Sequence, residues 1–329
     1  MLPAPPFTQP TRADILAAAG RLDGAAARTP LLESDRLNDR LGGRVLLKAE
    51  CLQRTGSFKF RGAYNFLSQL EDGEKAKGVV AYSSGNHAQG VARAARLLGV
   101  SATIVMPSNA PEIKIANTRS DGAEVVLYER SDGNRVQVAR AVVEETGGAL
   151  VPPFDHPWIM AGQGTVGLEV ADQMTALGIA PDLMIVPTSG GGLVGGCALA
   201  LEEPYPDMAV HTVEPEGYDD TALSLAAGER VEITPPGPSI CDALLLETPG
   251  ALTFEVNKTR LAPGYSVSDA EAGAAVAAAF YDLKIVLEPS GAAPLAVLLS
   301  GKEKLDGRTA VLVGSGGNVD AKLFKQLLD

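Results

Sequence analysis

A lysine at the start of a predicted helix is the first residue here that could do covalent chemistry. Lys59 follows a predicted strand at 44–50 and opens a predicted helix at 57–70. A helix N-terminus carries partial positive charge, so an amine placed there loses its proton more easily and suits a Schiff-base nucleophile. A surface lysine on an amphipathic helix is the alternative.

A polar turn follows the next predicted strand, 78–83, and leads into a predicted helix at 86–98. It carries Ser83, Ser84, Asn86 and His87 around a glycine. Hydroxyl, amide and backbone donors at a helix start form a cradle for a carboxylate. An ordinary helix cap with a glycine turn is the alternative.

A glycine-rich turn follows the predicted strand 182–187. Consecutive glycines expose successive N–H groups beside a helix N-terminus, which is a phosphate-binding arrangement. The turn matches neither GxGxxG nor GxxxxGK[ST], so a phosphate monoester is favoured over a dinucleotide or a triphosphate. A plain glycine turn is the alternative. The residues concerned are Ser189, Gly190, Gly191, Gly192 and Leu193.

A second glycine-rich turn, 314–318, follows the predicted strand 309–313 and carries Ser315. Its hydroxyl can hydrogen-bond a group inserted beside it. Together, these four motifs describe an aldehyde cofactor with one phosphate, held covalently by Lys59 beside an amino-acid carboxylate.

Short β-branched segments alternate with longer helical patterns along the chain. The pattern indicates an α/β fold with parallel sheets covered by helices on both faces. Ligands bind such sheets at the carboxyl ends of strands, where the four motifs fall. Further predicted strands are 101–106, 123–128 and 209–213, and further predicted helices are 134–146, 159–175, 192–203, 269–283 and 290–300.

The composition is that of a soluble globular protein. A net charge of −12, spread along the chain, argues against a nucleic-acid partner. The three cysteines form no CxxC pair, which favours a reducing compartment and disfavours a zinc site. The N-terminus is not typical of a signal peptide, and the Ala-rich runs 195–201 and 272–280 are too short to span a bilayer. We therefore expect a cytoplasmic protein without a membrane partner.

The motifs resemble those of the fold-type II pyridoxal-phosphate (PLP) enzymes, in the branch of threonine/serine dehydratases, 3-hydroxyaspartate dehydratases and serine racemases. SFKFRGA at 57–63 and SSGNH at 83–87 carry the resemblance, which extends from about 48 to 320. It implies a two-lobe fold like that of the tryptophan synthase β chain, and a homodimer. The implied reaction eliminates water from a β-hydroxy amino acid, leaving a 2-oxo acid and ammonia. Cysteine synthases carry different segments at these places, so β-replacement is disfavoured.

The resemblance also implies a role for each motif residue. Lys59 would bind the cofactor and take the α-proton, and Phe58 would pack against the ring. Asn86 would bond the phenolic oxygen and Ser315 the pyridine nitrogen. The phosphate would lie on Ser189, Gly190, Gly191, Gly192 and Leu193.

On the substrate side, the resemblance places the carboxylate among Ser83, Ser84, Asn86 and His87. In the racemases a serine at position 84 exchanges the α-proton from the opposite face. Serine racemase is therefore an alternative activity. A non-catalytic amino-acid or PLP sensor is an alternative of another class, against which intact Lys59 argues.

Two carboxylates lie close together in the sequence after strand 209–213. Glu214 and Asp220 on a tight loop suit a hard cation with oxygen ligands. The resemblance implies Mg²⁺, or Ca²⁺ or Mn²⁺, with the Tyr218 carbonyl as a further ligand. A solvated acidic loop is the alternative.

Arg135 falls on the apolar arc of the predicted helix 134–146. An arginine there is expected to meet an anion. One interpretation is a buried salt bridge. The other is a cleft position that pairs with the distal carboxylate of a substrate such as 3-hydroxyaspartate.

We expect a large cofactor-binding domain at 1–55 plus 156–329 and a small substrate-binding domain at 56–155. The chain ends soon after the fourth motif, so the C-terminal regulatory domain of biosynthetic threonine dehydratases, and feedback by isoleucine, are not expected.

Overall fold

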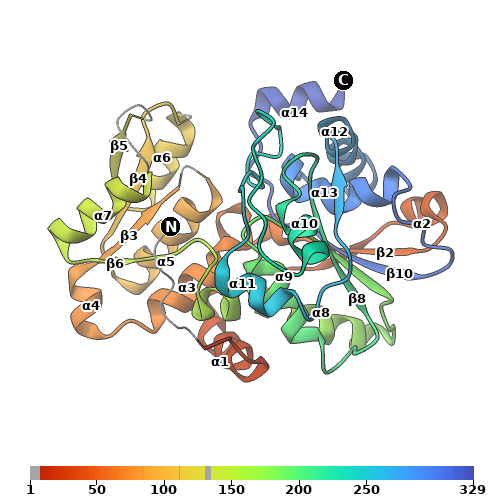
Figure 1. Cartoon of the computed structure of the whole chain (residues 1–329), viewed down its shortest axis with the longest axis horizontal. Helices are drawn as coiled ribbons and strands as arrows, with labels where there is room; N and C mark the ends of the chain where they lie inside the picture. The colour runs from red at the N-terminus through yellow and green to blue at the C-terminus, as the bar shows by residue number, and fades with distance from the viewer. Residues whose placement is uncertain (1–7, 84, 111, 130–134) are drawn as a thin grey trace.

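The computed structural model describes residues 8–83, 85–110, 112–129 and 135–329. Figure 1 shows two α/β halves side by side, each built around its own sheet. Apart from β1 against β2, all strand pairs in both sheets are parallel. The predicted α/β fold with parallel sheets is confirmed.

The six-stranded sheet forms the larger half. It contains β1 (Leu31–Glu33), β2 (Arg44–Lys48), β10 (Thr309–Val313), β7 (Leu183–Pro187), β8 (Ala209–Pro215) and β9 (Tyr265–Val267), in that spatial order. Alternate residues of the central strands face opposite layers because side chains alternate along a strand. Leu47 and Leu312 pack with α12 (Asp269–Ala278) and α13 (Pro289–Leu299), whereas Leu46 and Val311 pack with α8 (Pro157–Leu177) and α9 (Gly192–Leu201).

The four-stranded sheet forms the smaller half, in the order β5 (Glu124–Tyr128), β4 (Ala102–Pro107), β3 (Val79–Tyr82) and β6 (Ala149–Leu150). Ala81 and Ile104 face α3 (Lys59–Ser68) and α5 (Asn86–Leu98). Val80 and Val105 face α7 (Arg135–Thr146). Helix α3 also packs against α8 of the larger half, so the helix that carries Lys59 joins the two halves.

Every predicted strand is present, with ends within two residues of the prediction. The strands that the pattern missed, β1, β6 and β9, have only two or three residues each, too few for a periodic signal. The predicted helix 269–283 consists of α12 and a π-helical turn, η4 (Ala279–Leu283). The missed helical elements are α1 (Arg12–Leu22), α2 (Asp35–Leu41), η1 (Glu50–Leu52), η2 (Arg54–Gly56), α4 (Asp72–Lys77), α6 (Glu112–Ser120), α10 (Asp220–Ala227), α11 (Ala251–Asn257) and α14 (Ala321–Leu328).

Within the described ranges, no helix has both the length and the hydrophobicity that a bilayer crossing requires.

Candidate active site

A cavity of about 410 Å³ opens between the two sheets, within the usual size range of small-molecule sites. Elements of both halves line it, at the carboxyl ends of β3, β7 and β10. Of the residues predicted for the site, the lining includes Phe58, Lys59, Ser83, Asn86, His87, Arg135, Ser189, Gly190, Gly191, Gly192, Leu193 and Ser315. Ser84 lies outside the described residues.

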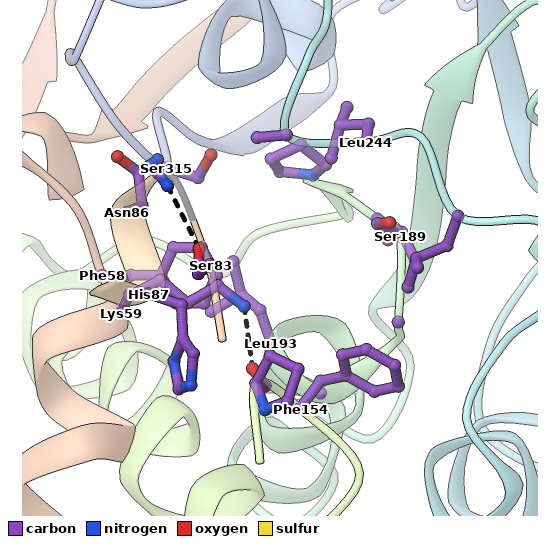
Figure 2. A pocket seen from close by; sticks show the side chains of 18 of the residues that line it. Phe58, Lys59, Ser83, Asn86, His87, Phe154, Ser189, Leu193, Leu244 and Ser315 are labelled. Atoms are coloured by element: carbon purple, nitrogen blue, oxygen red, sulfur yellow. Dashed lines mark hydrogen bonds between the residues drawn. The ribbon is translucent and has the colours of Figure 1, made fainter. Parts of the chain in front are cut away.

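Lys59 is the first residue of α3, and its side chain points into the cavity (Figure 2). Its Nζ donates a hydrogen bond to the Pro153 carbonyl at 2.8 Å. Desolvation by burial lowers the pKa of the amine to about 8, and no carboxylate of the described residues contributes to the shift. An amine with this pKa exists partly in the neutral form that attacks a carbonyl carbon.

Ser83 and His87 lie on the smaller half's side of the cavity. The Ser83 hydroxyl accepts a hydrogen bond from the Gly85 N–H at 3.1 Å. The His87 ring is buried, and its Nε2 lies 3.1 Å from the Val151 carbonyl. Burial, with Lys59 nearby, lowers the pKa of His87 to about 3. The imidazole is therefore neutral, so it can meet a substrate only as a neutral hydrogen-bonding group.

The side-chain amide of Asn86 is held at both ends. Its Nδ2 donates to Glu288 Oε1 at 2.7 Å, and its Oδ1 accepts from Asn318 Nδ2 at 2.7 Å. Asn318 also donates to the Thr55 carbonyl at 2.8 Å. These contacts fix which end of the Asn86 amide is which and leave one Nδ2 hydrogen for a ligand.

The glycine loop begins α9, with Gly191 as N-cap in a left-handed conformation (φ 85°). A Cβ on Gly190 would lie 2.2 Å from Cγ of Phe154, so no side chain fits there. Among the described residues, the N–H groups of Gly190 and Gly191 have no protein acceptor. Free donors at a helix start, without side chains in front of them, fit a phosphate group.

A second layer of contacts holds this loop in place. Thr253 donates to the Gly190 carbonyl at 2.6 Å, and Asn257 donates to the Gly191 carbonyl at 3.2 Å. Both residues belong to α11, whose first N–H groups donate to the Asp155 carboxylate. The loop's carbonyls are thereby turned toward α11.

A buried ion network lies behind α3. Arg61 makes ion pairs with Glu50 at 2.8 Å and Glu169 at 2.7 Å, and Glu169 pairs with Lys48 at 2.6 Å. Arg61, Glu50 and Lys48 are 1% exposed or less. The network ties α3 to β2, η1 and α8, and thus fixes the base of the helix that presents Lys59.

Arg135, the first residue of α7, is exposed and lines the cavity. Its guanidinium lies 5.9 Å from the centre of the Tyr82 ring. The exposure of this side chain contradicts the interpretation as a buried salt bridge, and no described residue forms an ion pair with it. The predicted helical face is nevertheless the inner one, because Ala139, one turn later, is fully buried. Tyr82 is the last residue of β3, so α7 begins at the carboxyl end of this strand, beside the cavity.

Glu214 and Asp220 are brought together outside the cavity lining, and both are fully buried. The Glu214 carboxylate accepts from the N–H groups of Thr221 and Ala222. Both Asp220 carboxylate oxygens lack a hydrogen-bond partner. Burial raises the pKa of Asp220 to about 7, and burial with Asp220 nearby raises that of Glu214 well above its usual value.

Tyr218, the remaining predicted ligand, is also buried, and its hydroxyl donates to the Gly237 carbonyl. No cluster of three or more His, Cys, Asp or Glu suited to a metal occurs among the described residues.

The sequence patterns missed several residues of the cavity. Lys114 of α6 and Asp242, both in the cavity lining, form an ion pair at 3.4 Å, and Glu288 accepts the hydrogen bond from Asn86. They belong to segments without a strong periodic or glycine signal. The single available clue was the order Glu288–Pro–Ser–Gly, an acidic residue before a helix that starts with proline.

The comparisons with known proteins agree with this site. The sequence model described as "Pyridoxal-phosphate dependent enzyme" matches residues 22–316. The chain belongs to this family of PLP enzymes, as its motifs indicated.

Individual relatives identify the branch of the family to which the chain is most similar. The chain is 42% identical to an L-threo-3-hydroxyaspartate ammonia-lyase from Pseudomonas sp, covering 96% of this chain and 97% of the relative. It is 38% identical to a serine racemase from Schizosaccharomyces pombe, with 97% of each covered. The crystal structure of a T.th. threonine deaminase matches with a TM-score of 0.89 and 44% identity, over 94% of this chain and 99% of that one. The predicted branch is confirmed.

Proposed function

We propose that this protein is a PLP-dependent ammonia-lyase that removes water and then ammonia from a small β-hydroxy amino acid: threonine, serine or 3-hydroxyaspartate. One observation carries the proposal. Lys59, with a pKa lowered to about 8, opens into the same cavity as a glycine loop with free N–H groups. The relatives include enzymes named for removing ammonia from hydroxyaspartate and from threonine.

The cavity residues fit the cofactor. Lys59 would hold its aldehyde carbon, and the loop from Ser189 to Leu193 would hold its phosphate. Phe58 would pack against the ring, Asn86 would donate its free Nδ2 hydrogen to the phenolic oxygen, and the Ser315 hydroxyl would meet the pyridine nitrogen. When bound, PLP supplies an electron-withdrawing ring that stabilises negative charge developing at the substrate α-carbon.

Each side chain of the cavity then has its own role in the reaction. Lys59 Nζ, in its neutral form, takes the α-proton, which its desolvated position favours. Ser83, Ser84 and neutral His87 orient the substrate carboxylate together with the backbone N–H of Asn86, whose side-chain amide is engaged by the cofactor. The neutral partner at the pyridine nitrogen favours prompt loss of the β-hydroxyl over reactions that need a long-lived carbanion.

Arg135 is proposed to select a dicarboxylate substrate. Its exposed guanidinium at the cavity mouth has no anionic partner among the described residues, and a distal carboxylate would provide one. Arg135→Ala should lower kcat/KM on 3-hydroxyaspartate about 10- to 100-fold, the value of one charge-assisted hydrogen-bonded pair, with a much smaller loss on threonine. Equal losses on both substrates would contradict this role. Arg140→Ala, on the same helix but outside the cavity lining, is the matched control.

We infer that a divalent cation, Mg²⁺ or else Ca²⁺ or Mn²⁺, binds Glu214, Asp220 and the Tyr218 carbonyl. The support is the pair of unpartnered Asp220 oxygens beside a second buried carboxylate. Such a pair is costly without a cation. The ion would act structurally, because these residues do not line the cavity.

We further propose a homodimer in the cytoplasm, which rests on the family resemblance and on three free cysteines. We also propose 1–55 plus 156–329 as the large cofactor-binding domain and 56–155 as the small substrate-binding domain. The two separate sheets support this division.

Ammonia and 2-oxo acid release over a panel of β-hydroxy amino acids, with Mg²⁺ or with EDTA, tests the function. Chiral analysis of the remaining serine in the same samples measures racemisation, which the similarity to serine racemases makes the second candidate. Release of ammonia by the wild type and its loss in Lys59→Ala are expected. Racemisation without ammonia would replace the proposal with serine racemase, and cofactor binding without either reaction would indicate a sensor.

A further inference from the structure

Glu288 is a buried carboxyl in the cavity wall that the reaction described above does not use. It is 4% exposed and stands at the N-cap of α13, but its side chain does not cap that helix. Instead, Oε1 accepts the hydrogen bond from Asn86 Nδ2. In the described part of the chain, no group donates to Oε2, so this oxygen is free to carry a proton.

The backbone around Glu288 holds the carboxyl in place. Its own N–H donates to the Gly316 carbonyl at 3.0 Å. A Cβ at Gly316 would lie 2.2 Å from Glu288 Oε1, so the side chain packs directly on the glycine next to Ser315. Asn318 of the same turn fixes the other end of the Asn86 amide. The GSGGN turn therefore does more than present Ser315: it fixes an Asn318–Asn86–Glu288 chain of hydrogen bonds.

We propose that Glu288 is a positioning residue that exchanges a proton with water and acts on the reaction through Asn86. This inference rests on the proposed function, because Asn86 is the residue assigned to the cofactor's phenolic oxygen. The two Nδ2 hydrogens of Asn86 then join Glu288 to that oxygen, so a charge on one side is felt on the other.

The charges around Glu288 determine when it ionises. Burial, and then Asp242, raise its pKa to about 7, whereas the Asn86 hydrogen bond and Lys114 lower it. Among the described residues, the thiols of Cys51 and Cys241 are further titratable neighbours, and their own pKa values are raised to about 12, so both are neutral. A cofactor adds negative charge and disfavours the carboxylate further. The holoenzyme should thus hold Glu288 protonated at neutral pH and lose activity as it ionises at alkaline pH.

Glu288→Gln and Glu288→Ala separate this role from packing. Glutamine keeps an oxygen acceptor for Asn86 but cannot ionise, whereas alanine removes both. We expect Glu288→Ala to lower kcat about tenfold, the value of one buried hydrogen bond to a charged or polarised group, and Glu288→Gln to recover part of the loss. The decisive readouts are the absorbance of the bound cofactor titrated without substrate, and the pH dependence of kcat/KM. Both should contain a transition in the wild type that is absent from Glu288→Gln.

Two neighbours should move this transition in opposite directions. Asp242→Asn removes a charge that raises the pKa of Glu288 and should shift the transition to lower pH. Lys114→Gln removes a charge that lowers it and should shift the transition to higher pH. Glu247→Gln, an exposed residue of the same loop as Asp242 that does not line the cavity, is the control and should leave the midpoint unchanged.

An unchanged spectral and kinetic transition in Glu288→Gln would overturn the inference, as would shifts of the same sign in Asp242→Asn and Lys114→Gln. Failure of the proposed function looks different, because the wild type itself would then release no ammonia from any member of the panel.

Discussion

Asp220→Asn is the substitution that tests the inferred cation most sharply, since both oxygens of this buried carboxylate lack a partner. The folded-state pKa of Asp220 is raised from 3.8 to about 7. A raised pKa means that stability is fully present below the unfolded-state value and is lost as pH rises through the folded-state value. At about 1.36 kcal/mol per pKa unit, the penalty without a cation reaches about 4 kcal/mol at most above pH 7.

A bound cation reverses this dependence of stability on pH, because the cation binds only the ionised carboxylate. In EDTA, unfolding of the wild type by urea should show stability that falls between about pH 4 and pH 8, and Asp220→Asn should be the more stable protein at pH 8. Mg²⁺ at about 100 times its Kd should stabilise the wild type by about 2.7 kcal/mol and the variant by much less. Losing an acidic residue from the first turn of α10 costs only about 0.3–1 kcal/mol, too little to hide these changes.

Glu229→Gln also removes one carboxylate, at an exposed position just after α10 and outside the proposed ligand set, and is the control. Equal stabilisation of the wild type and Asp220→Asn by Mg²⁺ would refute the cation site. So would equal stability of the two proteins in EDTA at pH 8.

Two further substitutions test the framework of the cavity. Gly190→Ala should lower PLP affinity at least tenfold in a fluorescence titration, because its Cβ would lie 2.2 Å from Cγ of Phe154; Gly20→Ala, with nothing within 4 Å, should bind PLP as the wild type does. Arg61→Ala should lower the free energy of unfolding by about 3–5 kcal/mol, because it leaves the Glu50 carboxylate buried without its partner; a loss below about 1 kcal/mol in urea unfolding would show that the network does not stabilise α3.

Much of the fold could be predicted because its central strands are buried on both faces. Continuous apolar runs such as β7 and β10 give a strong strand signal, and glycine-rich turns mark where they end. The short edge strands could not be found in this way. Helices such as α6 and α10 were missed because they are short and weakly amphipathic.

The site was predictable where reactive or polar residues, or a run of glycines, stand at the start of a predicted helix. Lys59, Asn86 and the glycine loop each stand at a helix start directly after a strand or turn. Glu288 and Lys114 could not be assigned, because their roles depend on which segments from opposite halves face each other. Arg135 shows the same limit. The helical wheel predicted which face of the helix carries Arg135, but only the fold shows that this helix starts beside the cavity.

The central claim is that the side chain of Lys59 holds the cofactor. Reduction of the holoenzyme with borohydride, followed by peptide mass spectrometry, reports this bond directly. We predict a pyridoxyl-phosphate adduct on Lys59, and no adduct anywhere in Lys59→Ala. An adduct on a different lysine, or a wild-type protein that binds PLP without any adduct, would contradict the account.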